Sequence, residues 1–596
     1  MGGIFGFICK KQRRVSDIIQ GLKRLIYRGY NGTGIMFLDA NGELKVVKQP
    51  VKVDEFKLDQ DYFANIAVGH TRYASRGWPT YENTHPLLDC NSKIGVVADG
   101  LIYDYEIIRD DLKSKGHKFV STTDVEVIPH LLEKNSVFDT ANMLKGLFAF
   151  VALFSKKNVI YAVQMDQPLV IGINDKEECY YVSSDIQSLN NFAEEALIVP
   201  DFTLVEISLD GIKAVNIYTG EQVELREKKR VKPFPGGEKA GFPHYMLKEI
   251  YEVPDALIST SLSLMDKYLR LSSMILYGAK NIYIIGNGTS LHAGMLASYY
   301  LLQNGLNANV ISAAEFPYYA LNNVTTGTVI VAISQSGETS DVIRSVKLAK
   351  QRGAVIVGVT NYVGSRLALE SNVYLPIAAG PEMAVPATKT FTSTILALLE
   401  LSYYVGLNTN KRTQSDISSL NENVKALSKS LKEIMPRLEK SAEEIAEKIY
   451  TWGDFYVASS GIMYPLALEG ALKLKEASGV HAEGFQMGEL MHGPLTLATK
   501  GLPIIFIRPV EDEAQELYYK VLENSKQKGA NLIAIESYDD RQKGEEGLLR
   551  LSVIKTVKDL MPISVAVALQ MLAYKIGVKR NMPIDTPPAL VKAVIY

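Results

Sequence analysis

Two short turns rich in hydroxyl side chains have the composition of a phosphate site. The first, residues 286–290 (Gly-Asn-Gly-Thr-Ser), follows an apolar run, and a helix is predicted to begin near His292. The second, residues 334–340 (Ser-Gln-Ser-Gly-Glu-Thr-Ser), also follows an apolar run. Helix N-termini offer backbone N–H groups and a favourable dipole to an anion. The side chains of both turns add hydroxyl donors, so each turn is a candidate for binding a phosphate.

Each turn alone is equally well explained as an ordinary strand-to-helix connection with a Ser or Thr helix cap. Two such turns after neighbouring parallel strands favour a site, because the carboxyl ends of those strands meet at one edge of the sheet. Neither turn is followed by the Gly-Lys-Ser/Thr of a nucleotide-binding P-loop. We therefore predict a small molecule with a single phosphate group as the ligand.

A polar helix is predicted over residues 466–476, and it could supply acid–base groups. Glu469, Lys473 and Glu476 are spaced by four and three residues, which places them on one face. A solvated ladder of salt bridges is the more common explanation of such spacing. The next segment, 481–494, favours a site, because it mixes His, Glu and Gly without a helical or strand period. Its two histidines do not form a His-Glu-x-x-His motif, so no metal is predicted.

The first part of the chain, residues 1–225, is predicted to form an α+β domain of packed sheets. Short β-type runs lie at 67–70, 94–97, 147–154 and 159–163, and helical stretches separate only some of them. Polar turn clusters lie between the runs, as expected for packed sheets.

The second part of the chain has an α/β pattern, in which amphipathic helices alternate with short β-branched runs. Residues 350–359 resemble residues 526–535, and each copy reads as a helix end, a glycine turn and a strand. Two similar domains with parallel sheets are therefore predicted. We assign residues 1–225 to the first domain, 226–243 to a linker, 244–415 and 416–580 to the two α/β domains, and 581–596 to a C-terminal tail.

The composition indicates a multidomain globular protein that binds small molecules. Of 596 residues, 47% are apolar and 22% are charged, and the net charge of −2 leaves no basic stripe for a nucleic acid. The three cysteines, Cys9, Cys90 and Cys179, have no CxxC spacing, so neither a disulfide framework nor a zinc site is predicted. No long unbroken apolar run and no secretory signal is recognised, so we expect a cytoplasmic protein with no membrane partner.

The order of several motifs resembles the glutamine:fructose-6-phosphate amidotransferase (glucosamine-6-phosphate synthase, isomerizing) family. The resemblance implies an N-terminal-nucleophile (Ntn) glutaminase-like α+β sandwich followed by two α/β sugar isomerase (SIS) domains with parallel sheets. The segments that match, besides the two hydroxyl-rich turns, are 27–30, 244–250, 387–392, 467–476 and 590–592.

The same resemblance implies roles for individual residues of the sugar-phosphate half. Glu476 would move a proton between C1 and C2, and Lys473 is a further catalytic candidate. The sugar phosphate would be bound by residues of the hydroxyl-rich turns: Thr289, Ser290, Ser334, Gln335, Ser336 and Thr339. Lys592 would form an imine with the open-chain ketose. His492 would assist ring opening and comes from a neighbouring subunit in the family, which implies a homodimer. No cofactor is expected.

In the glutaminase half, the resemblance exposes a missing nucleophile. The family begins Met-Cys-Gly-Ile and uses the cysteine thiol to attack glutamine. This chain begins Met-Gly-Gly-Ile, so Gly2 occupies the nucleophile position, and Cys9 is interpreted as a core residue. The oxyanion turn Asn-Gly of the family becomes Asp99-Gly100, and an ionised aspartate opposes developing negative charge.

Arg72 and Asp124, which in the family bind the α-carboxylate and α-amino groups of glutamine, are retained. We predict that glutamine is not hydrolysed and that free ammonia is the nitrogen donor for conversion of fructose 6-phosphate to glucosamine 6-phosphate. Two alternatives remain: a glucosamine-6-phosphate deaminase or phosphosugar isomerase, because the Glu476 and Lys592 chemistry is reversible, and a non-catalytic sensor of sugar phosphate or glutamine. The expected partners are hexose phosphate and ammonia or glutamine.

Overall fold

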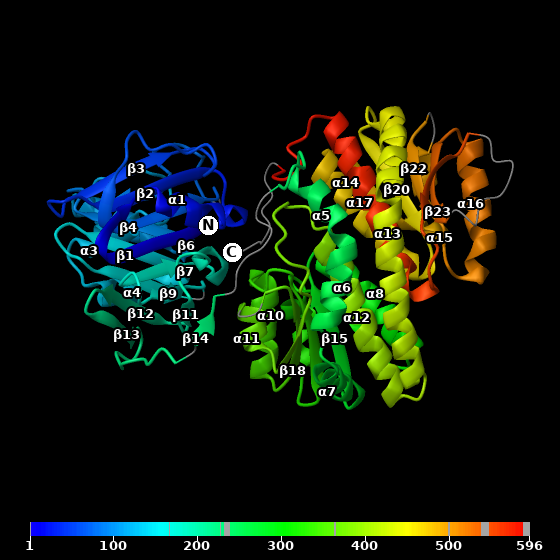
Figure 1. The fold of residues 1–596 in the computed structure, drawn as a ribbon, viewed down its shortest axis with the longest axis horizontal. Coiled ribbons are helices and arrows are strands. Elements are labelled where there is room, and N and C mark those ends of the chain that lie inside the picture. The colour runs from blue at the N-terminus through cyan, green and yellow to red at the C-terminus, as the bar shows by residue number, and fades with distance from the viewer. Residues whose placement is uncertain are drawn as a thin grey trace. The chain divides into compact units, whose positions relative to one another are not determined.

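The chain divides into two compact units, which are described separately (Figure 1). The computed structural model describes residues 2–74, 76–165, 167–226, 228–231, 239–362, 365–498, 501–537 and 547–587. The first unit is Met1–Gly237 with Ile595–Tyr596, and the second is Glu238–Val594.

The first unit contains two antiparallel sheets, with strand orders β14-β11-β9-β10-β1-β4-β2-β3 and β13-β12-β8-β7-β6-β5. Their strands are β1 (Gly2–Arg14), β2 (Gly32–Leu38), β3 (Leu44–Gln49), β4 (Phe63–Arg72), β5 (Leu87–Leu88), β6 (Ile94–Tyr103), β7 (Lys145–Phe154), β8 (Ile160–Met165), β9 (Val170–Asn174), β10 (Cys179–Ser183), β11 (Glu195–Ile198), β12 (Thr203–Ser208), β13 (Gly211–Asn216) and β14 (Lys228–Arg230). The helices are α1 (Asp17–Lys23), α2 (Tyr105–Ser114), α3 (Val127–Leu132) and α4 (Val137–Met143), with a 3₁₀ turn η1 (Ile26–Arg28).

The alternation of side chains along β1 explains how the layers of this unit form. Ile4 and Ile8 join a buried cluster with residues of the second sheet, such as Val151. Phe5 and Phe7 point to the opposite face, where α1 packs. Helix α3 covers the outer face of the second sheet in a third cluster. The result is the predicted α+β sandwich, and each β-type run expected from the sequence coincides with a strand to within one residue.

Two expectations for the first unit were wrong. Cys9 and Cys179 form a disulfide between directly opposed residues of β1 and β10, although their sequence spacing gave no sign of it. The start of the predicted linker, 228–230, is β14, an edge strand paired with β11. Its run of Lys and Arg resembles a linker in composition, but charged residues are also common on edge strands.

The second unit contains two five-stranded parallel sheets, with orders β16-β15-β17-β18-β19 and β21-β20-β22-β23-β24. Their strands are β15 (Asn281–Gly286), β16 (Asn309–Ser312), β17 (Thr328–Ile333), β18 (Val355–Thr360), β19 (Val373–Pro376), β20 (Asp454–Ser459), β21 (His481–Gln486), β22 (Pro503–Ile507), β23 (Asn531–Ser537) and β24 (Leu549–Val553). The helices are α5 (Tyr245–Tyr251), α6 (Val253–Ser263), α7 (Asp266–Tyr277), α8 (Thr289–Gln303), α9 (Phe316–Tyr319), α10 (Ser340–Gln351), α11 (Arg366–Glu370), α12 (Lys389–Asn408), α13 (Gln414–Ile449), α14 (Tyr464–Ser478), α15 (Met487–Leu490), α16 (Gln515–Gln527) and α17 (Met561–Lys579).

The internal repeat is visible in the backbone. Gly353 links α10 to β18 with φ of 82°, and Gly529 links α16 to β23 with φ of 88°. Both values lie in the left-handed region that favours glycine. The prediction of an irregular segment at 481–494 was partly wrong, because 481–486 is the edge strand β21, paired in parallel with β20. Its one fully buried side chain, Ala482, leaves too weak an alternation to read as a strand.

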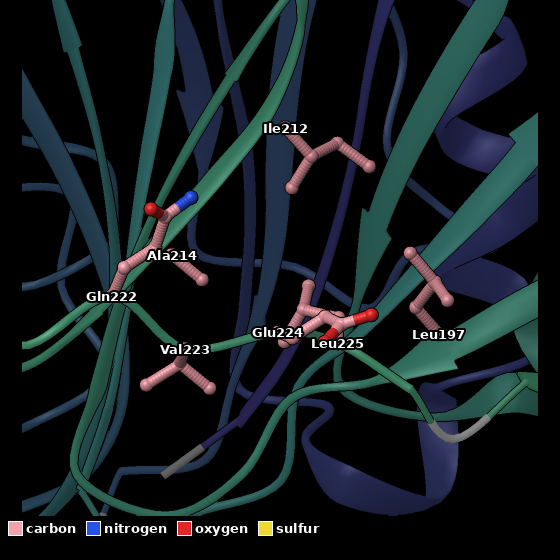
Figure 2. A pocket seen from close by; sticks show the side chains of 7 residues that line it. All are labelled: Leu197, Ile212, Ala214, Gln222, Val223, Glu224 and Leu225. Carbon is pink, nitrogen blue, oxygen red and sulfur yellow. The ribbon is translucent and has the colours of Figure 1, made fainter.

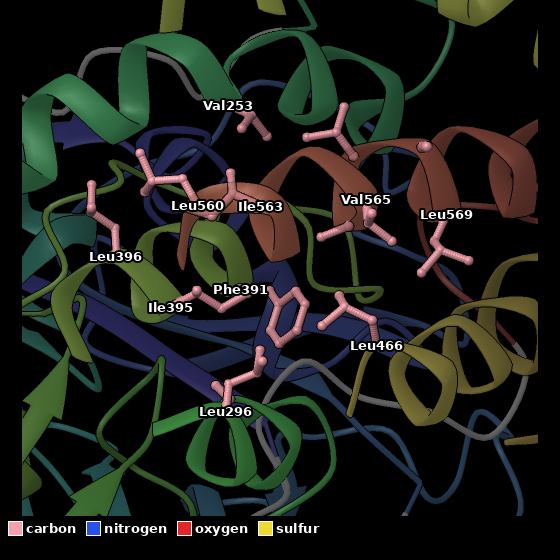
Figure 3. Packing of buried hydrophobic residues seen from close by; sticks show 14 of the residues in the cluster. Val253, Leu296, Phe391, Ile395, Leu396, Leu466, Leu560, Ile563, Val565 and Leu569 are labelled. Carbon is pink, nitrogen blue, oxygen red and sulfur yellow. The ribbon is translucent and has the colours of Figure 1, made fainter. Parts of the chain in front are cut away.

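One hydrophobic cluster extends through both α/β domains of the second unit. Figure 3 shows side chains from several helices in this cluster, among them Leu296 of α8, Phe391 of α12, Leu466 of α14 and Ile563 of α17. All four are at most 1% exposed. The two domains therefore share an apolar core between their sheets.

Two helices of this core are long and apolar enough to cross a membrane by length and composition alone. In α12 and in residues 558–579, 94% and 89% of the most apolar window is buried inside the fold. Such burial is typical of core helices, and it accounts for their hydropathy.

Candidate functional site

The two hydroxyl-rich turns lie side by side at one edge of the first parallel sheet. They follow β15 and β17, which are neighbours with Ile285 opposite Ala332. Helix α8 begins at Thr289, three residues before the predicted start, and α10 begins at Ser340. Asn287 Nδ2 donates to Asp341 Oδ2 at 2.9 Å and so ties the first turn to the start of α10.

The second turn is folded tightly around Ser334. Its hydroxyl lies 3.0 Å from Thr339 Oγ1 and 3.5 Å from Ser336 Oγ, and it accepts from the backbone N–H of Gly337 at 3.0 Å. Gly337 has φ of 68°, and a Cβ there would lie 2.1 Å from Ser365 Oγ. Only glycine fits this position, and the turn gathers several hydroxyl groups in the space of one anion.

Helix α14 places an acid–base cluster against the first turn. Lys473 is fully buried, and its Nζ contacts Glu476, lies 3.4 Å from Glu469 Oε1 and donates to Thr289 Oγ1 at 3.2 Å. Thr289 Oγ1 in turn donates to Glu469 Oε1 at 3.0 Å. The predicted helix and its polar face are confirmed, but this face is not a solvated salt-bridge ladder, because Glu469 is 1% exposed.

His292 of α8 completes the cluster, and the sequence gave no reason to include it. Its Nδ1 lies 2.7 Å from Glu469 Oε2, on a helix 177 residues away along the chain. Burial raises the pKa of Glu469. The Lys473 charge and the hydrogen bonds from His292 and Thr289 lower it by more than burial raises it, so the pKa lies below the ordinary value.

The pKa of Lys473 is shifted in the opposite direction. Burial lowers its pKa, but the charges of Glu469 and Glu476 raise it above the ordinary value. The lysine is therefore charged at neutral pH. Removing one member of such a buried ion pair costs about 3–5 kcal/mol, because the partner is left uncompensated.

The remaining predicted residues of this site are less buried than Lys473 and Glu469, or lie outside the described part of the chain. The Glu476 side chain is 16% exposed, and Ser290 and Gln335 are half-buried in their turns. His492 is exposed, in the turn that follows α15. Lys592 lies outside the described residues.

In the first unit, Gly2 begins β1 and is held by an ion pair. Its N–H donates to Asp99 Oδ1 at 2.8 Å, and Arg28 Nη2 donates to Asp99 Oδ2 at 2.7 Å. The side chains of Arg28 and Asp99 are each 2% exposed. Burial raises the pKa of Asp99, but the Arg28 charge and the Gly2 N–H lower it to a net value below the ordinary one. An anion therefore lies beside the nucleophile position.

The space at Gly2 is closed to any side chain. A Cβ there would lie 1.9 Å from the carbonyl oxygen of Thr71 and 2.5 Å from His70 Nε2. His70 is itself fixed, since it is fully buried and stacks on His85 with ring centroids 4.3 Å apart. Gly100 is equally confined, with φ of 105° and 2.0 Å between its hypothetical Cβ and Leu147 O.

Arg72 and Asp124 hold backbone groups in this arrangement. Arg72 donates to the carbonyl oxygens of Gly77 at 3.0 Å and Trp78 at 3.3 Å. Asp124 Oδ2 accepts from the N–H of Ile102 at 2.9 Å. Burial lowers the pKa of Arg72 to about 10, and Asp124 opposes that shift. Both side chains thus support the local backbone.

A separate cavity of about 530 Å³ in the first unit contains none of these residues. Figure 2 shows its lining, which comes from β11, β13 and the segment after β13 and is mostly aliphatic. The lining residues are Leu197, Ile212, Ala214, Gln222, Val223, Glu224 and Leu225.

A two-sheet sandwich joined to paired parallel-sheet domains, with hydroxyl-rich turns facing a buried acid–base helix, defines a two-part protein of the amidotransferase and sugar isomerase class. Family models agree with both parts: a glutamine amidotransferase domain matches residues 70–191, and a SIS domain matches residues 275–402 and 448–578.

The glutamine–fructose-6-phosphate aminotransferases (isomerizing) of Sulfolobus acidocaldarius and Aquifex aeolicus are each 34% identical to this chain, and each match covers all of both chains. The C-terminal domain of glucosamine-fructose-6-phosphate aminotransferase from Francisella tularensis has 31% identity and a TM-score of 0.55, covering 59% of this chain and all of that domain. This chain belongs to the isomerizing glutamine–fructose-6-phosphate aminotransferase family, as the sequence motifs predicted.

Proposed function

We propose that this protein converts fructose 6-phosphate to glucosamine 6-phosphate and takes its nitrogen from free ammonia. The observation that supports the sugar chemistry best is the hydrogen-bonded path from the first hydroxyl-rich turn to Glu476, through Thr289 and Lys473. A phosphate bound by the turns would place the sugar next to a carboxylate held by a buried cation.

In this proposal each polar group has one role. The hydroxyl groups of the two turns and the N-terminus of α8 bind the phosphate. The Lys592 amine condenses with the C2 carbonyl of the open-chain ketose, forming an imine and releasing water, and ammonia then displaces that amine. Glu476 moves a proton between C1 and C2, and Lys473 holds the Glu476 carboxylate in position.

A homodimer in the cytoplasm is part of the same proposal. His492 is exposed, so a second copy of the chain could receive its imidazole beside the sugar for ring opening. The substrates are small polar molecules, and the cytoplasm is where sugar phosphates and ammonium are available.

Loss of glutamine hydrolysis rests on Gly2 and Asp99. The nucleophile position has no thiol and no room for one, and an anion paired with Arg28 replaces an amide donor beside it. An oxyanion would be repelled at that point.

The test compares nitrogen donors with fructose 6-phosphate as the acceptor. We expect ammonium to yield glucosamine 6-phosphate and glutamine to yield none, with no ammonia released from glutamine. Glu476→Gln should lower product formation at least about 100-fold, as expected for loss of a general acid–base group. The matched control is Glu483→Gln, at an exposed glutamate of β21, which should keep full activity. Equal product from glutamine and ammonium would refute the ammonia dependence, and absence of product from either would refute the synthase.

A further inference from the structure

Four side chains of metal-binding types meet on the first unit, away from Gly2. Cys90 lies in the turn between β5 and β6, His117 follows α2, His130 belongs to α3, and Glu133 directly follows α3. Their ligand atoms all lie within 4.8 Å of one another.

Four of the six distances within this cluster are close to the edges of a tetrahedron around a metal ion, and the other two are at most 4.8 Å. Cys90 Sγ lies 3.7 Å from His117 Nδ1 and 3.5 Å from His130 Nδ1. Glu133 Oε1 lies 3.2 Å and 3.0 Å from the same two nitrogens. A tetrahedral zinc ion, with bonds of about 2.3 Å to sulfur and about 2.0–2.1 Å to nitrogen and oxygen, requires edges of about 3.5 Å and about 3.3 Å.

The cluster is held in place by its surroundings. His130 and Glu133 are three residues apart and share one face, and α3 is anchored in a hydrophobic cluster. The side chains of His117 and His130 are 6% and 1% exposed, whereas Cys90 is exposed and leaves a path for an ion.

A carboxylate also lies near the second nitrogen of one imidazole. His130 Nε2 is 3.8 Å from Glu126 Oε1, too far for a hydrogen bond, but zinc-bound histidines usually have a carboxylate on this side of the ring. Glu126 is fixed by the backbone N–H groups of Val120 and Ser121 at 2.6 Å and 2.7 Å. Glu133 Oε1 also accepts from the backbone N–H of Cys90 at 3.0 Å, which fixes the carboxylate beside the thiol.

We propose that the first unit binds one Zn²⁺ through Cys90 Sγ, His117 Nδ1, His130 Nδ1 and Glu133 Oε1. Binding replaces the thiol proton of Cys90, which is released to water, and the imidazoles bind in their neutral form. Four protein ligands close the coordination sphere, so the ion is structural and fastens the turn after β5 and the segment after α2 to the end of α3. The absence of a CxxC pair concealed the site, because its ligands are spread over the segment from 90 to 133.

The test measures metal binding by the full chain. Protein stripped with a chelator and refilled with Zn²⁺ should retain about one zinc per chain after gel filtration. With Co²⁺ in place of zinc, the protein should show the visible bands of a tetrahedral site and a thiolate charge-transfer band in the near ultraviolet. Competition with a chelating dye should give affinities at least about 100-fold weaker for Cys90→Ser and His130→Asn.

The control variant is His481→Asn, which removes an exposed histidine of β21 and should bind zinc like the parent chain. The Co²⁺ spectrum of the parent chain tests the site even if a ligand variant fails to fold. Retention of less than about one zinc per ten chains, a Co²⁺ spectrum without the thiolate band, or equal zinc affinity in the parent and Cys90→Ser would each overturn the proposal.

Discussion

A β-carbon placed on Gly2 would overlap the carbonyl oxygen of Thr71 and the imidazole of His70. Gly2→Cys should therefore release no ammonia from glutamine, although it restores the residue type of the family. The variant should also lower the unfolding temperature of the first unit by several degrees, since overpacking costs about 1–3 kcal/mol.

An ammonia assay and a thermal unfolding curve check both parts of this prediction. Gly453→Cys is the control, because a Cβ at that position meets nothing within 4 Å. Glutamine hydrolysis by Gly2→Cys would contradict the conclusion that Thr71 and His70 leave no room for a side chain at this position.

The buried histidine pair makes the first unit sensitive to acid. Burial lowers the pKa of His70 to about 3, and burial together with the His70 charge lowers the pKa of His85 well below its ordinary value. An unfolded histidine binds a proton below about pH 6.5 that native His70 does not bind, so stability is full above that pH and falls as the pH falls.

Urea unfolding of the first unit between pH 7.5 and 5 should reveal this dependence. The parent chain should lose about 1.4 kcal/mol per pH unit more than His70→Phe below pH 6.5. Histidines that do not contact His70 contribute equally to both proteins and cancel in the comparison, and His85 stays buried in both. Parallel pH profiles for the two proteins would contradict the prediction.

Among individual residues, local spacing was the reliable guide. The face shared by Glu469, Lys473 and Glu476 followed from helical geometry, and it is the face that meets Thr289. His292 and Arg28 were missed because each depends on a partner far along the chain, Glu469 and Asp99. No local sequence pattern predicts a contact between residues so far apart in the chain.

At the scale of elements, the disulfide joins two strands that are neighbours only in the folded sheet. Cys9 and Cys179 are 170 residues apart in sequence, so the bond restricts the unfolded chain strongly and should stabilise the first unit by about 2–4 kcal/mol. Addition of dithiothreitol should lower the unfolding temperature of that unit accordingly.

The matched variant for this experiment is Cys9→Ala/Cys179→Ala. Its unfolding temperature should be lower than that of the oxidised parent and should not respond to dithiothreitol. An equal response of both proteins to the reductant would show that the bond contributes nothing.

The elements themselves were largely predictable, because hydrophobic period and glycine turns are local signals. The strands 67–70 and 147–154 and the helix 466–476 all appear in the structure. The errors fell on edge strands, β14 and β21, whose sequences are too polar to give a clear period. Prediction of the disulfide would have required the register of β1 with β10, which cannot be read from the sequence.

At the scale of the whole molecule, each unit has its own buried clusters. Calorimetry of the full chain should therefore resolve two unfolding transitions. Fructose 6-phosphate at about 100 times its dissociation constant should stabilise the second unit by about 2.7 kcal/mol and leave the first unchanged.

The transitions can be assigned with dithiothreitol, which acts on the disulfide of the first unit. A shift of that same transition by fructose 6-phosphate would contradict a sugar-phosphate site in the second unit. The order of domains was predictable from motifs, whereas the shared core of the second unit was not, because α12 and α17 appear in sequence as ordinary apolar helices.

Sharing that core makes the two copies of the duplicated half depend on each other. Eighteen of the residues in α12, from Lys389 to Gly406, are buried, most of them against α6, α7 and α8 of the same copy and some against α13 and α17 of the other. Each copy therefore has apolar surface that the other covers. We expect the two pieces of a chain cut between α12 and α13 to aggregate when separate and to associate when mixed.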